Sequence, residues 1–158
     1  MSSTNPSIEK RKRPGVARSY RNEQIEVDWE PELCIHAAYC LRGLPQVFDR
    51  NRRPWVMVDA ASAGEIAATI MQCPTGALRF RRSDGGPQEP LPEQATIEAR
   101  PNGPLYLRGN LHIVDQDGTV HELPRAALCR CGQSANKPFC DGTHRAIHFN
   151  TSTAPGEG

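Results

Sequence analysis

Hydrophobic and polar residues alternate along two segments in the first half of the chain. In residues 25–30 apolar side chains alternate with acids, and in residues 78–81 they alternate with arginines. A period of two predicts a half-buried β-strand in each segment. If the two strands pair, their exposed faces set acids against arginines, a match worth a few tenths of a kcal/mol per pair. We therefore expect both strands in one closed module.

A helix is predicted between these two strands. Ser62 and Glu65 have the S-x-x-E spacing of a capping box, which marks a helix start. The apolar residues that follow lie on one helical face: Ile66, Ile70 and Met71. The helix must stop at Cys73, because Pro74 disfavours helical geometry in the residue before it.

The second half of the chain is predicted to be mainly β. It follows a stretch rich in Gly, Pro and acids, residues 83–94, which is typical of a linker. Short strands are then expected at residues 96–99, 105–108, 111–114 and 119–123. Asp117-Gly118 lies between the last two and is a hairpin turn signal.

These patterns predict an α+β protein built from two small modules. The first module is expected over residues 20–82 and the second over residues 95–150. A basic tail, residues 1–19, and a polar tail, residues 151–158, are predicted to be disordered. Two small cores bury little surface, so each module needs a further source of stability.

Composition narrows the function classes and the compartment. The chain has 158 residues and a net charge of +1, which favours neither nucleic acid nor an acidic substrate as a partner. No segment resembles a secretory h-region or a membrane span, so we expect a soluble, cytoplasmic protein with no membrane partner. In a reducing compartment, six cysteines near histidines favour metal binding over disulfides.

Three cysteines and one histidine gather in a single loop, CRCGQSANKPFCDGTH, residues 129–144. The candidate ligands are Cys129, Cys131, Cys140 and His144. Four such donors suit a tetrahedral zinc site, or the two irons of a [2Fe-2S] cluster when they act as two pairs. Zinc sites usually use C-x2-C or longer knuckles, and the C-x-C spacing here is unusual for them.

The full pattern of this loop, C-x-C-x2-S-x3-P-x-C-D-G-T-H, resembles the CDGSH (mitoNEET-like) iron–sulfur family. The resemblance implies a small β-rich module with a [2Fe-2S] cluster. It implies Cys129 and Cys131 on one iron, and Cys140 and His144 on the other. It also implies a homodimer, because single-motif members of that family pair.

The first module holds the other three cysteines, Cys34, Cys40 and Cys73. A bacterial ferredoxin loop runs C-x2-C-x2-C and closes with a distant C-P. This chain keeps the outer pair and the distant Cys-Pro, but Ala37 stands at the middle ligand position. Buried structural thiols or a zinc site are the alternatives that these residues leave open.

The segments IEVDWEPELCIHAAYC, GLPQVFDRNRRPW and CPTGALRF resemble the divergent 4Fe-4S mono-cluster ferredoxin family. The resemblance implies a ferredoxin-like module with iron and sulfide. Three thiolates suit a [3Fe-4S] cluster, whereas a [4Fe-4S] cluster needs a fourth ligand, for which His36 is a candidate.

Two cluster modules without a nucleotide-binding fingerprint predict a one-electron carrier and not an enzyme. Its partner would be a reductase or oxidoreductase. One alternative is a cluster donor or a redox or pH sensor that uses the labile His144-ligated cluster. Another alternative is a zinc-stabilised interaction module.

Overall fold

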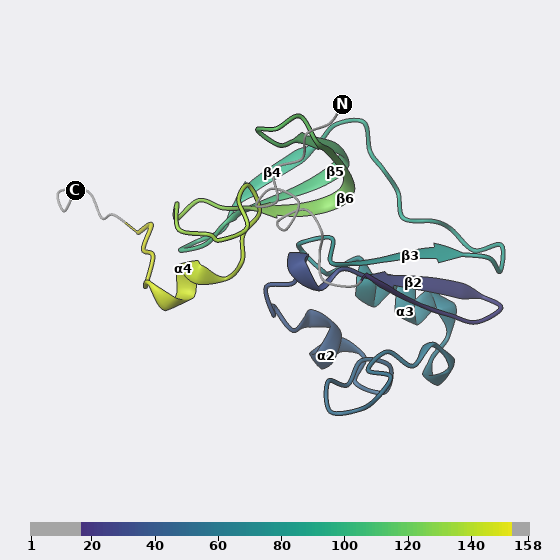
Figure 1. Cartoon of the computed structure of the whole chain (residues 1–158). Coiled ribbons are helices and arrows are strands. Elements are labelled where there is room, and N and C mark those ends of the chain that lie inside the picture. The colour runs from purple at the N-terminus through teal and green to yellow at the C-terminus, as the bar shows by residue number, and fades with distance from the viewer. Residues whose placement is uncertain (1–16, 153–158) are drawn as a thin grey trace. The chain divides into compact units, whose positions relative to one another are not determined.

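The computed structural model describes residues 17–152, which form two compact units that adjoin in sequence between Pro90 and Leu91. Each unit contains one three-stranded antiparallel sheet, with several short helices in the first unit and one in the second (Figure 1), so the expected mixture of α and β elements is confirmed. The predicted tails lie outside the described residues over 1–16 and 153–158, whereas Arg18 and Ser19, which were also assigned to the first tail, lie in a strand. No helix within residues 17–152 has the length and apolar character needed to span a bilayer.

The sheet of the first unit has the order β1-β2-β3, with β1 at Arg18–Arg21, β2 at Ile25–Trp29 and β3 at Leu78–Arg82. The expected pairing of β2 with β3 is confirmed: Glu26 lies opposite Arg81. The Nη2 atom of Arg81 lies 2.5 Å from Oε1 of Glu26. Strand β1 was not predicted, because it is an edge strand of mostly exposed residues with no apolar alternation.

Short helices connect these strands. They are η1 at Pro31–Leu33, α2 at Tyr39–Gly43, η2 at Val58–Ala60 and α3 at Ala63–Ile70. The predicted cap of α3 is confirmed, because Oγ of Ser62 accepts a hydrogen bond from the Glu65 N–H at 3.1 Å. The helix ends at Ile70, three residues before the expected stop, and a turn leads from there to Cys73.

A hydrophobic core fills the space between the sheet and α3 of the first unit. Ile25 and Val27 of β2, Ile66 and Ile70 of α3, and Leu78 of β3 are almost completely buried in it. The apolar halves of the alternating segments thus point into one core, as their periodicity requires.

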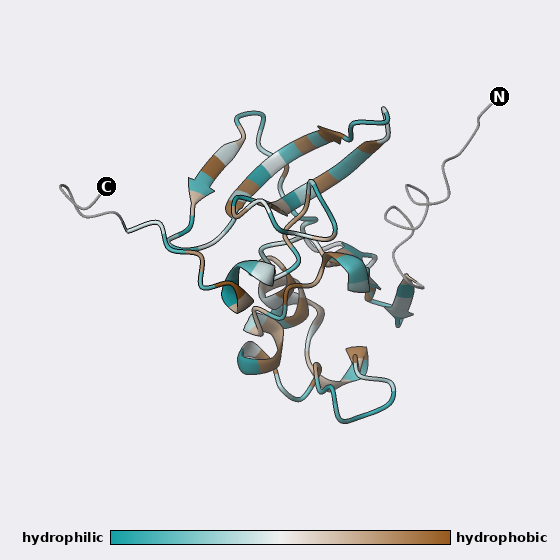
Figure 2. Cartoon of the chain, turned by 60° about the vertical axis from the view of Figure 1, so that its left-hand side comes forward, coloured by the Kyte–Doolittle hydropathy of each residue, from teal (hydrophilic) through white to brown (hydrophobic). Residues whose placement is uncertain are grey.

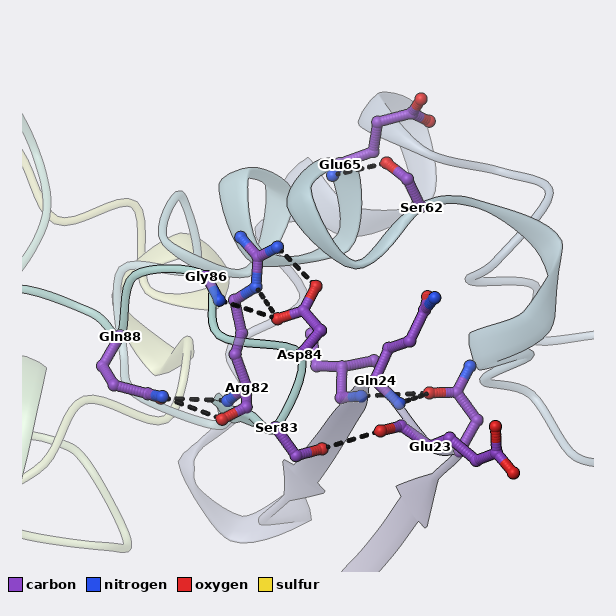
Figure 3. Close-up of polar contacts among 11 residues, drawn as sticks. Glu23, Gln24, Ser62, Glu65, Arg82, Ser83, Asp84, Gly86 and Gln88 are labelled. Atoms are coloured by element: carbon purple, nitrogen blue, oxygen red, sulfur yellow. Dashed lines mark hydrogen bonds and ion pairs between the residues drawn. The ribbon is translucent and has the colours of Figure 1, made fainter.

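The start of the predicted linker is hydrogen-bonded to the first unit (Figure 3). Asp84 accepts hydrogen bonds from the Arg82 side chain and the Gly86 N–H. The Gln88 amide bonds both the N–H and the carbonyl of Arg82. The Ser83 hydroxyl donates to the carbonyl of Glu23. Residues 83–88 therefore extend the first unit beyond β3.

The second unit has a sheet of order β4-β5-β6 and one short helix. Its elements are β4 at Thr96–Ala99, β5 at Leu105–Val114, β6 at Val120–Leu128 and α4 at Thr143–Ala146. Hydrophilic and hydrophobic residues are interspersed along these strands (Figure 2). The predicted turn after β5 is present, with the Gly118 N–H bonded to the Asp115 carbonyl at 2.8 Å.

Two of the strands predicted separately form the single strand β5. Its pairing with β6 shifts register between Arg108 and Leu111, around Gly109. Gly109 has a φ of 145°, and a Cβ there would lie 3.0 Å from the Cα of Ala95. A bulge at a glycine interrupts the alternation of apolar and polar residues, which explains why two strands were predicted here. Strand β6 also runs five residues further than expected, to Leu128.

Candidate metal centres

The CDGSH loop begins where β6 ends and folds back beside that strand. The Cys129 N–H bonds the carbonyl of Pro138 at 2.9 Å, and the Cys140 N–H bonds the carbonyl of Ala127 at 2.8 Å. Leu128 and Phe139 form an isolated antiparallel bridge between the same two arms. These backbone contacts bring the arm with Cys129 next to the arm with Cys140.

The four candidate ligands of this loop lie in two pairs. The Sγ atoms of Cys129 and Cys131 are 3.9 Å apart, and Sγ of Cys140 lies 3.4 Å from Nδ1 of His144. Two donors on one tetrahedral ion lie about 3.6–3.8 Å apart, given metal–sulfur bonds of about 2.3 Å and metal–nitrogen bonds of about 2.0–2.1 Å. Each pair thus has the spacing to hold one metal ion.

Backbone N–H groups point at the sulfur atoms of the loop. The Sγ atoms of Cys129, Cys131 and Cys140 accept such hydrogen bonds from Gly132, Gln133 and Gly142, respectively, at 3.3–3.4 Å. Burial raises the pKa of the Cys129 thiol, but N–H bonds from Ser134 and Gly132 outweigh it, and the net pKa is lowered. The loop therefore favours a thiolate at Cys129, and such N–H bonds to sulfur also tune the potential of iron–sulfur groups.

His144 lies on α4 and is buried. Burial lowers the pKa of its imidazole, the charge of Arg145 lowers it further, and Asp141 partly opposes this. A neutral imidazole is the form that binds metal. The Asp141 carboxylate accepts N–H bonds from Ala135 and Thr143, at 2.9 and 3.0 Å, so it fixes the turn of the loop.

The three cysteines of the first unit come from separate segments. Cys34 directly follows η1, Cys40 lies in α2, and Cys73 lies three residues after the end of α3. Burial raises the pKa of the Cys40 thiol to about 11, with further contributions from the charges of Cys73 and Cys34. The Cys34 and Cys73 thiols therefore both affect the ionisation of Cys40. Such a group is costly as bare thiolates, and a cationic metal centre removes that cost.

The loop between Cys34 and Cys40 has an unusual backbone around the position of the absent ligand. His36 and Ala38, on either side of Ala37, have φ values of 58° and 67°. Non-glycine residues seldom adopt this left-handed conformation, and it is concentrated at functional sites. Nδ1 of His36 lies 3.9 Å from Sγ of Cys34, so the structure places the candidate fourth ligand beside one of the three cysteines.

Arg50 is a neighbour of this loop that the sequence interpretation missed. Its Nη1 atom lies 3.4 Å from Nδ1 of His36. The signal was present in the arginine-rich run RNRRP at residues 50–54, but no periodicity related that run to the cysteines.

The thiols of both units are compatible with metal binding. No disulfide joins any of the six cysteines, all of which lie within residues 17–152. In that part of the chain, no three His, Cys, Asp or Glu side chains converge on one ion position. The donors are instead arranged in pairs in the second unit and as three separate thiols in the first. The soft thiolate and imidazole donors fit iron–sulfur groups. The ligand assignments for Cys34, Cys40, Cys73, Cys129, Cys131, Cys140, His144 and His36 stay predictions.

Comparison with known proteins identifies two families along the chain. Residues 20–83 match the divergent 4Fe-4S mono-cluster family, and residues 102–145 match the CDGSH-type iron-binding zinc finger family. The uncharacterized protein YjdI of Escherichia coli K12 is 36% identical over 67 residues, which cover 42% of this chain and 88% of YjdI.

Iron–sulfur subunits of formate dehydrogenases are also similar. The subunit of Haemophilus influenzae is 33% identical over 74 residues, covering 42% of this chain and 23% of the subunit. The nitrate-inducible subunit of Escherichia coli K12 is 30% identical over 121 residues, covering 63% of this chain and 40% of the subunit. This chain thus spans less than half the length of either subunit.

Two thiol-rich modules of these kinds define an iron–sulfur protein. The chain belongs to the divergent 4Fe-4S mono-cluster family through its first unit and carries a CDGSH domain in its second, which confirms the fusion that the sequence suggested.

Proposed function

We propose that this protein is a two-cluster, one-electron carrier without an enzymatic activity of its own. Cys129, Cys131, Cys140 and His144 would hold a [2Fe-2S] cluster. Cys34, Cys40 and Cys73 would hold a [3Fe-4S] cluster, or a [4Fe-4S] cluster with His36 as a fourth ligand, in a ferredoxin-like module. These groups would supply reversible uptake and release of single electrons.

The observation that carries the proposal is the pairing of donors in the CDGSH loop. The distances of 3.9 and 3.4 Å within the two pairs match the bite of one metal ion each, and the pairs are the ones that the family resemblance assigns to separate irons. The similarity to subunits named as iron–sulfur components of formate dehydrogenases supports an electron-transfer role. A redox partner protein would supply or accept the electrons. Homodimer formation and a cytoplasmic location stay predictions.

Iron and acid-labile sulfide content, with visible and EPR spectra before and after dithionite, test this proposal. Anaerobically purified protein should contain about five to six irons per chain, two in the second unit and three or four in the first. A [3Fe-4S] form of the first cluster would add an EPR signal in the oxidised state. About two irons would restrict the function to the second unit. Colourless protein that contains zinc and cannot be reconstituted with iron and sulfide would disprove the proposal.

A carrier also differs from a cluster donor in what happens to its iron. A carrier keeps its iron through repeated reduction and oxidation, whereas a donor passes iron and sulfide to an apo-ferredoxin in stoichiometric amounts. Mixing the protein with apo-ferredoxin and measuring the iron retained after separation distinguishes the two roles. Loss of one cluster equivalent to the apo-ferredoxin would favour the donor.

A further inference from the structure

A pocket of about 790 Å³ in the first unit is lined by Cys34, His36 and Cys40, so the proposed first cluster would form part of its wall. Its volume lies within the range of about 300–1,000 Å³ that is typical of small-molecule sites. Besides these candidate cluster ligands, a molecule in the pocket would contact side chains that the proposed cluster does not use. Three of the lining side chains are arginines, namely Arg18, Arg50 and Arg53, and none of the described residues that line it is acidic.

The three arginines place positive charge on the wall of this pocket. No ion pair within residues 17–152 engages Arg18, Arg50 or Arg53. Nη1 of Arg53 donates to the backbone carbonyls of Arg50 and Arg52, at 3.1 and 2.9 Å, which fixes this guanidinium in place. Guanidinium groups bind carboxylates through paired hydrogen bonds, and a pocket with one sign of charge concentrates the opposite ion.

The remaining walls of the pocket are aromatic. Trp29, Trp55 and Tyr20 line it, and the rings of Trp29 and Trp55 meet edge to face with centroids 4.8 Å apart. Trp55 also contacts the buried Phe48, with centroids 5.7 Å apart, so the core of the unit supports the wall. Rigid aromatic walls provide contact area for a flat apolar body at low entropic cost.

We propose that this pocket binds a small organic carboxylate with a planar apolar body, beside the thiols of Cys34 and Cys40. The arginines would bind the carboxylate and the aromatic side chains the planar body. The inference extends the proposed function by placing a ligand next to the first cluster. The arginine and aromatic side chains belong to the polypeptide, so binding of the carboxylate can be measured whichever type of cluster the first unit holds.

Calorimetric titration of the iron-loaded, full-length protein with 2-naphthoate and with the neutral 2-naphthamide tests this proposal. For a ligand of this size we expect a dissociation constant of roughly 0.1–1 mM for 2-naphthoate. The amide should bind at least about tenfold more weakly, because it has no negative charge and no second acceptor oxygen for a paired bond with a guanidinium. The chain has two tryptophans, both in the pocket wall, so their emission should change with the same midpoint.

Arginine variants locate the binding site. Arg18→Gln and Arg50→Gln should each weaken 2-naphthoate binding on the order of tenfold and leave the weak amide binding unchanged. Arg21→Gln and Arg42→Gln remove the same charge from neighbouring positions on β1 and α2 that do not line the pocket. These two controls should bind like the unmodified protein, and circular dichroism should show that all four variants are folded.

Three results would overturn the proposal. They are no binding of 2-naphthoate up to about 10 mM, equal binding of the acid and the amide, and unchanged binding in both arginine variants. Equal binding would indicate that the arginines serve only to offset the charge of the thiolates. Iron and sulfide are measured on the same samples. Carboxylate binding without iron would therefore refute the proposed function alone, and iron without binding would refute this inference alone.

Discussion

The two units differ in how much apolar side chain they bury. The first has a continuous core from β2, α3 and β3, in which Ile25, Ile66 and Ile70 are fully buried. In the second unit, the buried hydrophobic residues are few, and two of them are alanines: Leu111, Leu123, Ala126, Ala127, Phe139 and Cys140. A module with a small core usually depends on a metal or disulfide for stability. The difference indicates that metal binding and folding are coupled more strongly in the second unit than in the first.

The two sets of candidate ligands also differ in how the rest of the fold positions them. The candidate ligands of the second unit all lie in one loop of sixteen residues, residues 129–144. This loop is held by backbone contacts with β6 and by the Arg130 side chain, which donates to the carbonyls of Arg100 and Gly103. In the first unit the three cysteines lie at the ends of elements that the hydrophobic core already positions. Loss of metal should therefore have unequal consequences for the two units.

Removing one ligand from the CDGSH loop should have the largest effect. In Cys140→Ser the iron content should fall by about two atoms per chain. The amides of β5 and β6 should then exchange as in an unfolded chain, because the small core cannot hold the sheet. Hydrogen exchange measured by mass spectrometry on peptides from each unit gives the readout.

The matched variant in the first unit is Cys73→Ser. It should lose the first cluster while the amides of α3 stay protected, since the core around Ile66 is independent of metal. Protected β5 and β6 amides in iron-depleted Cys140→Ser would show that the second unit is stable without its metal. The conclusion that the second unit depends on its metal more than the first would then be wrong.

A cavity in the core should affect the first unit next most strongly. Ile66→Ala should lower its free energy of unfolding by about 2–5 kcal/mol, because a fully buried side chain loses its contacts and leaves a void. The cost should be the same with and without iron, as judged by urea unfolding followed through Trp emission. Ile66→Val, which removes one methylene, should cost about 0.5–1.5 kcal/mol. A cost that disappears on iron removal would mean that the first unit also folds through its metal.

Much of the fold follows from short-range patterns in the sequence. The alternation in residues 25–30 and 78–81 predicted β2 and β3 and their pairing, because period-two burial is a property of single strands. The Ser62 cap was predictable for a similar reason, since capping uses atoms only three residues apart. Strand β1 was missed because an exposed edge strand has no buried apolar face, and its sequence therefore shows no alternating pattern.

The two candidate sites also differ in whether their residues are close together in the sequence. The spacing of the CDGSH loop is local, so its four ligands could be proposed from the sequence. The environment of Cys34 and Cys40 depends on residues distant in sequence, namely Arg18, Trp55 and Arg50. No periodicity links those positions. Only the folded chain shows that the arginine-rich run and the aromatic residues face the cysteine loop.

Acidification should release iron from the second unit before the first. His144 is the only candidate ligand of its loop that is a neutral base, and an imidazolium has no lone pair for iron. Its pKa is lowered by burial, so an unfolded chain binds this proton more readily than the folded one. Stability is then full above the unfolded pKa, about 6.5, and falls as the pH drops below it.

The His144→Cys variant tests whether this ligand sets the acid response. Its visible cluster absorbance should persist to a pH lower by about one unit, equivalent to about 1.4 kcal/mol for one proton. Stopped-flow or equilibrium absorbance against pH measures the midpoint. Equal acid lability of the two proteins would show that another group controls loss of this cluster.

The smallest expected effect is on the helix cap of the first unit. Ser62→Ala removes the bond between Oγ of Ser62 and the Glu65 N–H, at a cost of about 1 kcal/mol. For a module of this size that lowers the melting temperature by about 4–8 °C. Helix α4 of the second unit has no such side-chain cap, as Gly142 occupies its N-cap position. Ser62→Asp keeps a capping oxygen and should melt near the unmodified protein. If calorimetry shows Ser62→Ala shifting the transition of the second unit as well, the two units do not unfold independently, and the contrast in their sources of stability fails.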